Sequence, residues 1–229
     1  MPQMPRPVRL FHITAIDNLA AIFEQNALLC KQRTDQQGIG YQNIAHAGAQ
    51  GTRAARQVIN PPGGSVHEYV PFYFAPRSPM LSAIHHGRVT GCQYKQEDIV
   101  HFELIARHAV EEGMKEFVFY DRNATKDYSK AYTDPAALKD VVDWEILTEA
   151  PTLDGFCKYF HDQHDNPRYI DRMEKRQAEF LIKYLVPVAW FSRIGVISET
   201  KTQEVRSLVE RFEVNLRVDV MTDWYFLGQ

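Results

Sequence analysis

Short hydrophobic runs alternate with polar, glycine-rich or proline-containing stretches along the chain, and most of the runs have the length of a β-strand. The runs predict strands at 8–13, 69–74, 99–105, 116–120, 178–186, 189–197, 217–221 and 224–227. Apolar residues at helical spacing predict helices at 14–26, within 43–56, at 78–87, at 134–142 and from 200 onward. Strands and helices follow no regular βαβ rhythm, which indicates an α+β fold and a single domain over 1–229.

Capping residues place the starts of several of these helices. Ser78 and Asp134 each precede a proline, a combination that is typical of a helix start. Thr14 and Asp17 can cap the helix after the first strand, and Thr200 begins a capping-box pattern. We therefore expect side-chain caps at all of these positions.

The stretch 148–172 stands out because it is polar, contains glycine and proline, and has little apolar periodicity. It is predicted to be a long loop. Long loops inside compact domains are usually functional or disordered.

Composition narrows the classes of protein that the chain can belong to. The 229 residues are 45% hydrophobic and 24% charged, which is ordinary for a globular domain. No apolar run can span a bilayer and the first residues have no signal-peptide core, so we expect a cytoplasmic protein without membrane contact. The three cysteines favour neither a disulfide framework nor a zinc site, and no metal is expected.

The charge balance bears on nucleic-acid binding. A formal net charge of −3 argues against a protein that coats nucleic acid without specificity. Local basic residues, Arg53, Arg56, Arg77 and Arg88, could still form a groove, although a solvated face is the simpler interpretation.

Glu179 is the first candidate for chemistry. It opens the apolar strand of the run RQAEFLI at 176–182, at the edge of the expected core. A buried carboxylate is costly unless it is paired or functional. The structural alternative is a strand-end acid that pairs with Arg176 or Arg172.

His12, Tyr73 and Arg53 are weaker candidates when each is taken alone. His12 ends a strand and could be a core residue or a donor to a ligand ribose or amide. Tyr73 lies in an aromatic strand and could pack in the core or against a planar ring. Arg53 lies in a glycine-rich stretch and could be a surface residue or bind phosphate in a bidentate manner.

Together, these residues lie in motifs that resemble the DarT toxins, which are DNA ADP-ribosyltransferases of bacterial toxin–antitoxin pairs. The motifs are LFHIT…DN at 10–18, G-x-R at 51–53, HEYVPFYFAPRSPML at 67–81, VVDW at 141–144 and KRQAEFLI at 175–182. The resemblance covers nearly the whole chain. It implies the ADP-ribosyltransferase fold, in which a split β-sheet surrounds a cleft for NAD, the co-substrate.

The resemblance also implies roles for individual residues. Glu179 matches the catalytic glutamate, and Arg53 matches the arginine that contacts the NAD phosphate and the reacting ribose. A carboxylate beside that ribose can stabilise oxocarbenium charge and take a proton from the attacking base nitrogen.

The remaining matched positions belong to the NAD pocket. His12 matches the histidine at the nicotinamide side, with Thr14 and Asn18 in the same motif. Tyr73 matches the aromatic residue that packs on nicotinamide, and Met80 matches the segment that lines the pocket.

The acceptor is expected to be a base of single-stranded DNA, and the loop 148–172 occupies the place of the family's substrate-recognition loop. Where the family has a histidine in F-V-F-T-D-x-H-A, this chain reads FVFYDRNA with Asn123, so the base remains open between thymine and guanine. The resemblance implies a macrodomain antitoxin as partner. Transfer to RNA or protein, and a non-catalytic nucleic-acid-binding module, remain the alternative functions.

Overall fold

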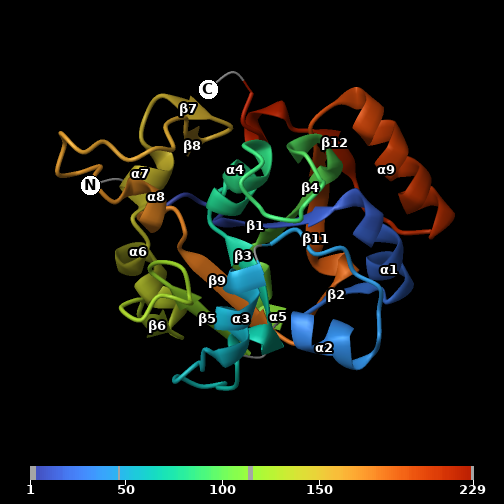
Figure 1. Ribbon diagram of the computed structural model, residues 1–229, viewed down its shortest axis with the longest axis horizontal. Coiled ribbons are helices and arrows are strands. Elements are labelled where there is room, and N and C mark those ends of the chain that lie inside the picture. Colours follow the sequence, from blue (N-terminus) through green and yellow to red (C-terminus); the bar gives the residue numbers. More distant parts are fainter. Residues whose placement is uncertain (1–3, 46, 113–115, 228–229) are drawn as a thin grey trace.

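A large sheet forms the centre of the computed structural model, which describes residues 4–45, 47–112 and 116–227 (Figure 1). From edge to edge its eight strands are β12 (Val218–Val220), β11 (Phe191–Val196), β4 (Ile99–Ile105), β1 (Arg9–Ala15), β3 (Tyr69–Tyr73), β9 (Glu179–Lys183), β5 (Phe117–Tyr120) and β6 (Ala131–Tyr132). Neighbouring strands are antiparallel except for β11 and β12. The mixture of this sheet with separate helices confirms the α+β class.

The sheet is split between β1 and β3. Strand β1 pairs with β4 along its whole length, and β3 pairs with β9 along its whole length. Between β1 and β3 the register has a single pair, Phe11 with Tyr73. The two halves of the sheet therefore separate at this junction, as the resemblance implied.

Helices and short connections surround both halves of the sheet. They are α1 (Leu19–Glu24), α2 (Lys31–Gln36), α3 (Ala47–Ala55), α4 (Pro79–His85), α5 (Ala106–Glu112), α6 (Leu138–Val141), α7 (Trp144–Thr148), α8 (Arg172–Lys175) and α9 (Glu199–Arg211). Helices α1 and α9 contact each other at the β12 end of the sheet, whereas α6, α7 and α8 lie at the other side, near β6 (Figure 1).

Aromatic packing explains why the predicted aromatic strands lie inside. Phe180 of β9 stacks on Phe117 and Phe119 of β5, with ring centroids 5.1 and 6.2 Å apart. Phe74, which follows β3, meets the ring of Phe180 edge to face, with the two centroids 6.3 Å apart. These geometries are the ones that aromatic quadrupoles favour, so they hold β5 and the β3 end against β9.

Two predicted strands differ from the structure. The run 178–186 breaks at Tyr184, whose φ of 66° turns the chain out of the sheet. Its backbone N–H donates to the Glu68 carbonyl at 2.7 Å, and β10 (Leu185–Pro187) then pairs with β2 (Ala27–Leu29) in a separate sheet. The run 224–227 is not a strand: Trp224 ends a 3₁₀ helix at Thr222–Trp224, and residues 225–227 are irregular.

The helix caps are confirmed in part. Ser78 and Asp134 cap their helices through side-chain oxygens, as predicted. The cap of α9 is Ser198 rather than Thr200, because the Ser198 hydroxyl accepts from the backbone N–H of Lys201 at 3.4 Å. Thr200 lies inside the first turn of α9.

The stretch 148–172 is a loop only in part. It contains the hairpin of β7 (Thr152–Leu153) and β8 (Phe156–Cys157), which turns at Asp154 and Gly155 with positive φ. From 158 to 171 the chain follows turns and bends until α8 begins. The first part of the predicted loop is therefore a hairpin, and the second part, 158–171, has neither helix nor strand.

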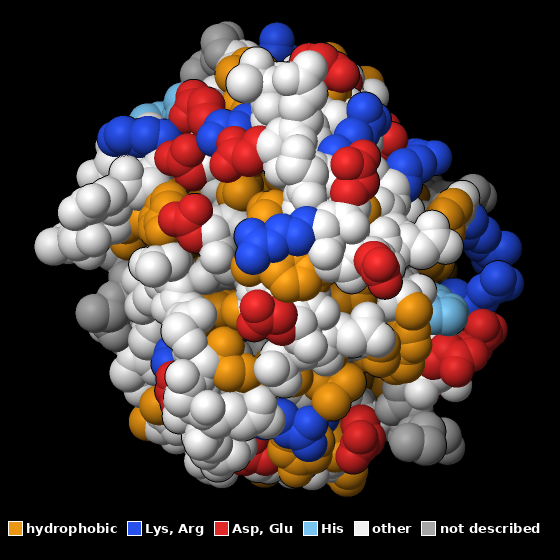
Figure 2. Space-filling view, turned by 90° about the vertical axis from the view of Figure 1, so that its right-hand side faces the viewer, with side chains coloured by type: hydrophobic (Ala, Val, Ile, Leu, Met, Phe, Trp, Pro, Cys, Tyr) orange, Lys and Arg blue, Asp and Glu red, His pale blue; other side chains and the backbone are white. Residues whose placement is uncertain are grey.

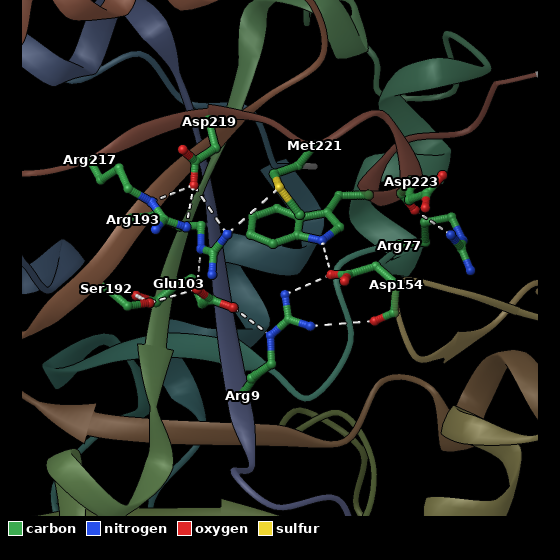
Figure 3. A network of polar contacts seen from close by, with 11 residues as sticks. Arg9, Arg77, Glu103, Asp154, Ser192, Arg193, Arg217, Asp219, Met221 and Asp223 are labelled. Atoms are coloured by element: carbon green, nitrogen blue, oxygen red, sulfur yellow. Dashed lines mark hydrogen bonds and ion pairs between the residues drawn. The ribbon is translucent and has the colours of Figure 1, made fainter.

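A polar network fixes this hairpin to the sheet (Figure 3). Asp154 accepts from Arg9 and from the indole N–H of Trp224, each at 2.7 Å. Arg9 also pairs with Glu103, which is 2% exposed and accepts from Arg193 at 2.7 Å. The buried carboxylate of Glu103 is thus compensated by two guanidinium groups, as a buried charge requires.

The surface carries charges of both signs. On the face at the right of Figure 1, acidic and basic side chains are interspersed with apolar ones (Figure 2). Within the part of the chain that the structure describes, no helix has both the length and the apolar character needed to cross a bilayer.

Candidate active site

A cleft of about 500 Å³ lies at the split in the sheet. One part of its wall comes from β1 and the segments 29–34 and 41–45, and the other from β3, α3, α4, β9 and the segment after β5. The cleft brings together five of the predicted site residues: His12, Arg53, Tyr73, Met80 and Glu179.

Glu179 is the buried carboxylate of this cleft. As the first residue of β9 it lies opposite Tyr73 of β3 and Tyr120 of β5, and it is 1% exposed. Both of its oxygens accept from Nη1 of Arg53, at 3.0 and 3.2 Å. Its Oε2 also accepts the backbone N–H of Ala124 at 3.1 Å. The carboxylate is therefore charge-paired and held from two directions.

The predicted structural alternative for Glu179 is wrong. Arg172 bonds to Glu149 at 3.1 Å and not to Glu179. Arg176 is 2% exposed, packs 5.6 Å from the ring of Phe160, and has no ion pair among the described residues. The partner of Glu179 is instead Arg53, which lies 126 residues away in the sequence.

Arg53 reaches the carboxylate from the last turn of α3. A cation is favoured at this end of a helix because the helix dipole is negative there. The Arg53 side chain is 13% exposed, so it can face both Glu179 and the space of the cleft. The expectation of a helix within 43–56 is confirmed.

His12 joins the two halves of the split sheet. Its Nδ1 lies 2.8 Å from the Pro71 carbonyl, which can only accept, so Nδ1 carries the proton. Burial lowers the pKa of His12 to about 4, which keeps the ring neutral at pH 7. Its Nε2 has no hydrogen-bond partner among the described residues. Nε2 is therefore a hydrogen-bond acceptor. His12 was expected to donate to a ligand, but its one donor, Nδ1–H, is used by the Pro71 carbonyl.

Thr14 and Asn18 lie behind the cleft wall. Asn18 donates to Thr14 Oγ1 at 2.9 Å and to the Gln42 carbonyl at 3.0 Å, and it accepts the Gln42 N–H at 2.6 Å. Thr14 Oγ1 is 2.7 Å from the hydroxyl of Tyr41, which lines the cleft. Thr14 and Asp17 therefore do not cap a helix, because the turn after β1 starts without a side-chain cap. Both Thr14 and Asn18 position the segment that begins at Tyr41.

Tyr73 and Met80 line the cleft on the β3 side. Burial and the nearby Glu179 charge raise the pKa of Tyr73, so its phenol stays protonated. Met80 is the second residue of α4, two positions after the Ser78 cap, and is partly buried. A neutral phenol and a polarizable thioether make this wall suitable for packing against a planar ring.

Sequence reasoning missed several residues of the site. The Ala124 N–H has no side-chain signature, and Thr125 and Ile44 line the cleft outside the motifs of the resemblance. Gln177 also lines the cleft; it lies in the motif at 175–182 but was given no role. Asn123, the position at which the chain departs from the family pattern, also lines the cleft. No cluster of three or more potential metal ligands occurs among the residues that the structure describes.

Comparison with known proteins identifies the family of this chain. The family model described as "ssDNA thymidine ADP-ribosyltransferase, DarT" matches residues 11–226. A DNA ADP-ribosyl transferase of Thermus sp. (strain 2.9) is 35% identical over 224 residues, which covers 97% of this chain and 98% of the relative. A DNA ADP-ribosyl transferase of Escherichia coli O127:H6 is 34% identical over 230 residues, which covers 97% and 95%.

Solved structures agree with the sequence comparison. The Thermus sp. 2.9 DarT in complex with ADP-ribosylated ssDNA aligns with a TM-score of 0.84 and 34% identity, covering 98% of this chain and 99% of that one. The same Thermus protein in complex with NAD⁺ aligns with a TM-score of 0.78 and 33% identity, covering 97% and 99%. The match over nearly the full length shows that this chain belongs to the DarT family of DNA ADP-ribosyltransferases.

Proposed function

We propose that the protein transfers ADP-ribose from NAD to a thymine of single-stranded DNA and releases nicotinamide. The observation that carries this proposal is the buried Glu179, held by Arg53 and the Ala124 N–H at the split of the sheet. The family description names thymidine as the acceptor. The Thermus relative, aligned over nearly the whole chain, has been solved in complex with NAD⁺ in one structure and with ADP-ribosylated ssDNA in another.

The chemistry follows from the position of the carboxylate. Loss of neutral nicotinamide breaks the bond to the ribose anomeric carbon and leaves oxocarbenium charge on the sugar, as in glycoside cleavage. Glu179 would stabilise that charge, and its fixed position means that little reorganisation is needed. A thymine N3 would then form the new bond to the same carbon, while its proton passes to Glu179 and on to solvent.

The other cleft residues would bind and orient NAD. Arg53 carries a charge that can turn from Glu179 toward the diphosphate or the ribose hydroxyls. The Nε2 of His12, an acceptor, would take a hydrogen bond from the carboxamide N–H₂ of nicotinamide. Tyr73 and Met80 would pack on the ring. Thr14 and Asn18 would act indirectly, by holding the segment at Tyr41.

The DNA would approach over a wall made of two segments, 121–130 and 148–172. Arg122 bonds to Asp171 at 3.4 Å, which ties the two segments together, and the Tyr128 hydroxyl bonds to Glu174 in α8, just beyond the second segment. Tyr128 and Tyr159 on this wall are 58% and 50% exposed. Exposed aromatic rings are the usual stacking platforms for unpaired bases. We therefore propose 148–172 as the recognition loop of a single ADP-ribosyltransferase domain over 1–229.

The proposal extends to the cellular context. DNA and NAD are both present in the cytoplasm, where we expect the enzyme to act. A toxin that modifies DNA needs an antagonist, and the resemblance to toxin–antitoxin pairs implies a macrodomain antitoxin that removes the modification.

The test is to incubate the protein with NAD and short single-stranded DNA oligomers, each lacking one base, and to measure their mass. We expect a gain of one ADP-ribose unit that disappears only when thymine is missing, and no gain with E179Q. A gain that depends on guanine would correct the acceptor. Transfer only to RNA or protein would refute the DNA assignment, and NAD binding without any transfer would indicate a non-catalytic binding module.

A further inference from the structure

Asn123 lies beside the catalytic carboxylate in a fixed orientation. Its neighbour Ala124 donates the backbone N–H that holds Glu179. Asn123 itself lines the cleft and is partly buried, and it follows shortly after Tyr120, which faces Glu179 across the β5–β9 pair. A group on Asn123 is therefore close to the reaction centre, on the wall that also includes Thr125.

The direction of the Asn123 amide is set by Thr125. The Asn123 Oδ1 lies 3.0 Å from the backbone nitrogen of Thr125 and 2.6 Å from its hydroxyl. A backbone N–H can only donate, so the atom that faces it must be the amide oxygen. The amide nitrogen then points away from Thr125, and it donates to no acceptor among the described residues.

The surrounding turn keeps this arrangement rigid. The Asn123 carbonyl accepts the N–H of Lys126 at 3.0 Å, which closes a turn. Asp121 accepts the N–H of Lys130 at 2.9 Å and the Ser129 hydroxyl at 3.2 Å, which closes the segment around it. Because the turn is closed, the free N–H₂ group does not need to be ordered again when a ligand binds.

We propose that the Asn123 amide N–H₂ selects the acceptor base by donating to a keto oxygen next to the attacking nitrogen; this rests on the proposed function. Glu179 is an acceptor and Asn123 presents a donor beside it. The thymine edge offers the complementary order, with N3–H between two keto oxygens, O2 and O4. Adenine has no keto oxygen and leaves the amide unpaired, whereas guanine has one, O6, so the amide discriminates against adenine and not between thymine and guanine. Asn123 is thus a specificity residue of the acceptor side.

Three variants test this assignment on the full chain. N123A removes the donor, and N123D is isosteric but replaces the donor with a charged acceptor. N215D makes the same chemical change at an exposed position between α9 and β12, at the far edge of the sheet from Asn123. For each, kcat/KM is measured with oligomers whose only candidate acceptor is one thymine, and the NAD dissociation constant is measured by calorimetry.

We expect N123A to lower kcat/KM for thymine roughly tenfold and N123D to lower it further, whereas N215D matches the wild type. The NAD dissociation constant should change less than about threefold, because the amide acts on the acceptor. Unchanged kcat/KM for thymine in N123A and N123D would overturn the assignment, as would an equal weakening of NAD binding. Absence of transfer to any DNA by the wild type would refute the proposed function itself.

Discussion

Removing Arg53 is expected to destabilise the fold more than neutralising Glu179, although both changes break the same ion pair. In R53M the Glu179 carboxylate stays 1% exposed and retains only the Ala124 N–H. Leaving one partner of a buried pair unpaired costs roughly 3–5 kcal/mol. In E179Q the amide oxygen can still accept from Arg53 and Ala124, and Arg53 is 13% exposed, so we expect a loss of only about 1–2 kcal/mol.

Urea denaturation of the wild type, R53M, E179Q and the double variant measures these values as a double-mutant cycle. We expect a coupling energy of about 2–3 kcal/mol, because the second change removes the charge that the first leaves unpaired. For a chain of this size, the loss in R53M corresponds to a decrease in Tm of roughly 6–20 °C. Additive effects, with R53M no less stable than E179Q, would refute the idea that Arg53 compensates a buried carboxylate.

Three further predictions concern two residues at the cleft and one in β11. The pKa of His12 is about 4 in the fold and 6.5 in the unfolded chain, so between these values the unfolded chain binds a proton that the folded protein does not. Stability is therefore full above pH 6.5 and is lost as the pH falls toward 4. Over this range the free energy of unfolding should fall by about 3 kcal/mol more in the wild type than in H12Q. N18A should raise the NAD dissociation constant roughly tenfold in calorimetry, because the bonds of Asn18 to Gln42 hold the cleft wall. A Cβ at Gly195 would overlap the Trp224 indole, so G195A should lower the unfolding free energy by roughly 1–3 kcal/mol in urea denaturation.

Local signals in the sequence were sufficient for much of the fold. The aromatic and β-branched runs predicted β1, β3 and β4 to within two residues, because strand alternation and burial depend on neighbouring positions. Ser78 and Asp134 capped their helices as predicted, since a cap needs only the residues of the first turn. The break at Tyr184 had no such signal, because its positive φ is stabilised by backbone bonds to Glu68 and Cys30, which are far away in the sequence.

The candidate site depended on contacts that no local pattern contains. The apolar strand marked Glu179, but its nearest cation in the sequence, Arg176, is directed into a buried aromatic contact, and the true partner comes from α3. The Ala124 N–H is a backbone group, so any residue other than proline could supply it. Only the resemblance to a family placed Arg53 and Glu179 at the same ribose of NAD before the structure was known. Periodicity reports on neighbouring positions and gives no information on a contact between residues 126 positions apart.

Pro71 explains why the cleft opens where it does. In an extended strand, the carbonyl and the N–H of one residue point to the same edge, and the Pro71 carbonyl faces β1, where it accepts from His12. The N–H that β1 would need at this position is the one that proline lacks. Continued pairing of β1 and β3 past Phe11 and Tyr73 would lack this hydrogen bond, and the His12 side chain satisfies the Pro71 carbonyl. The hydrogen bond from His12 to the Pro71 carbonyl also fixes the ring with Nε2 as an acceptor, so Pro71 contributes both to the weak pairing at the split and to the chemistry of the cleft.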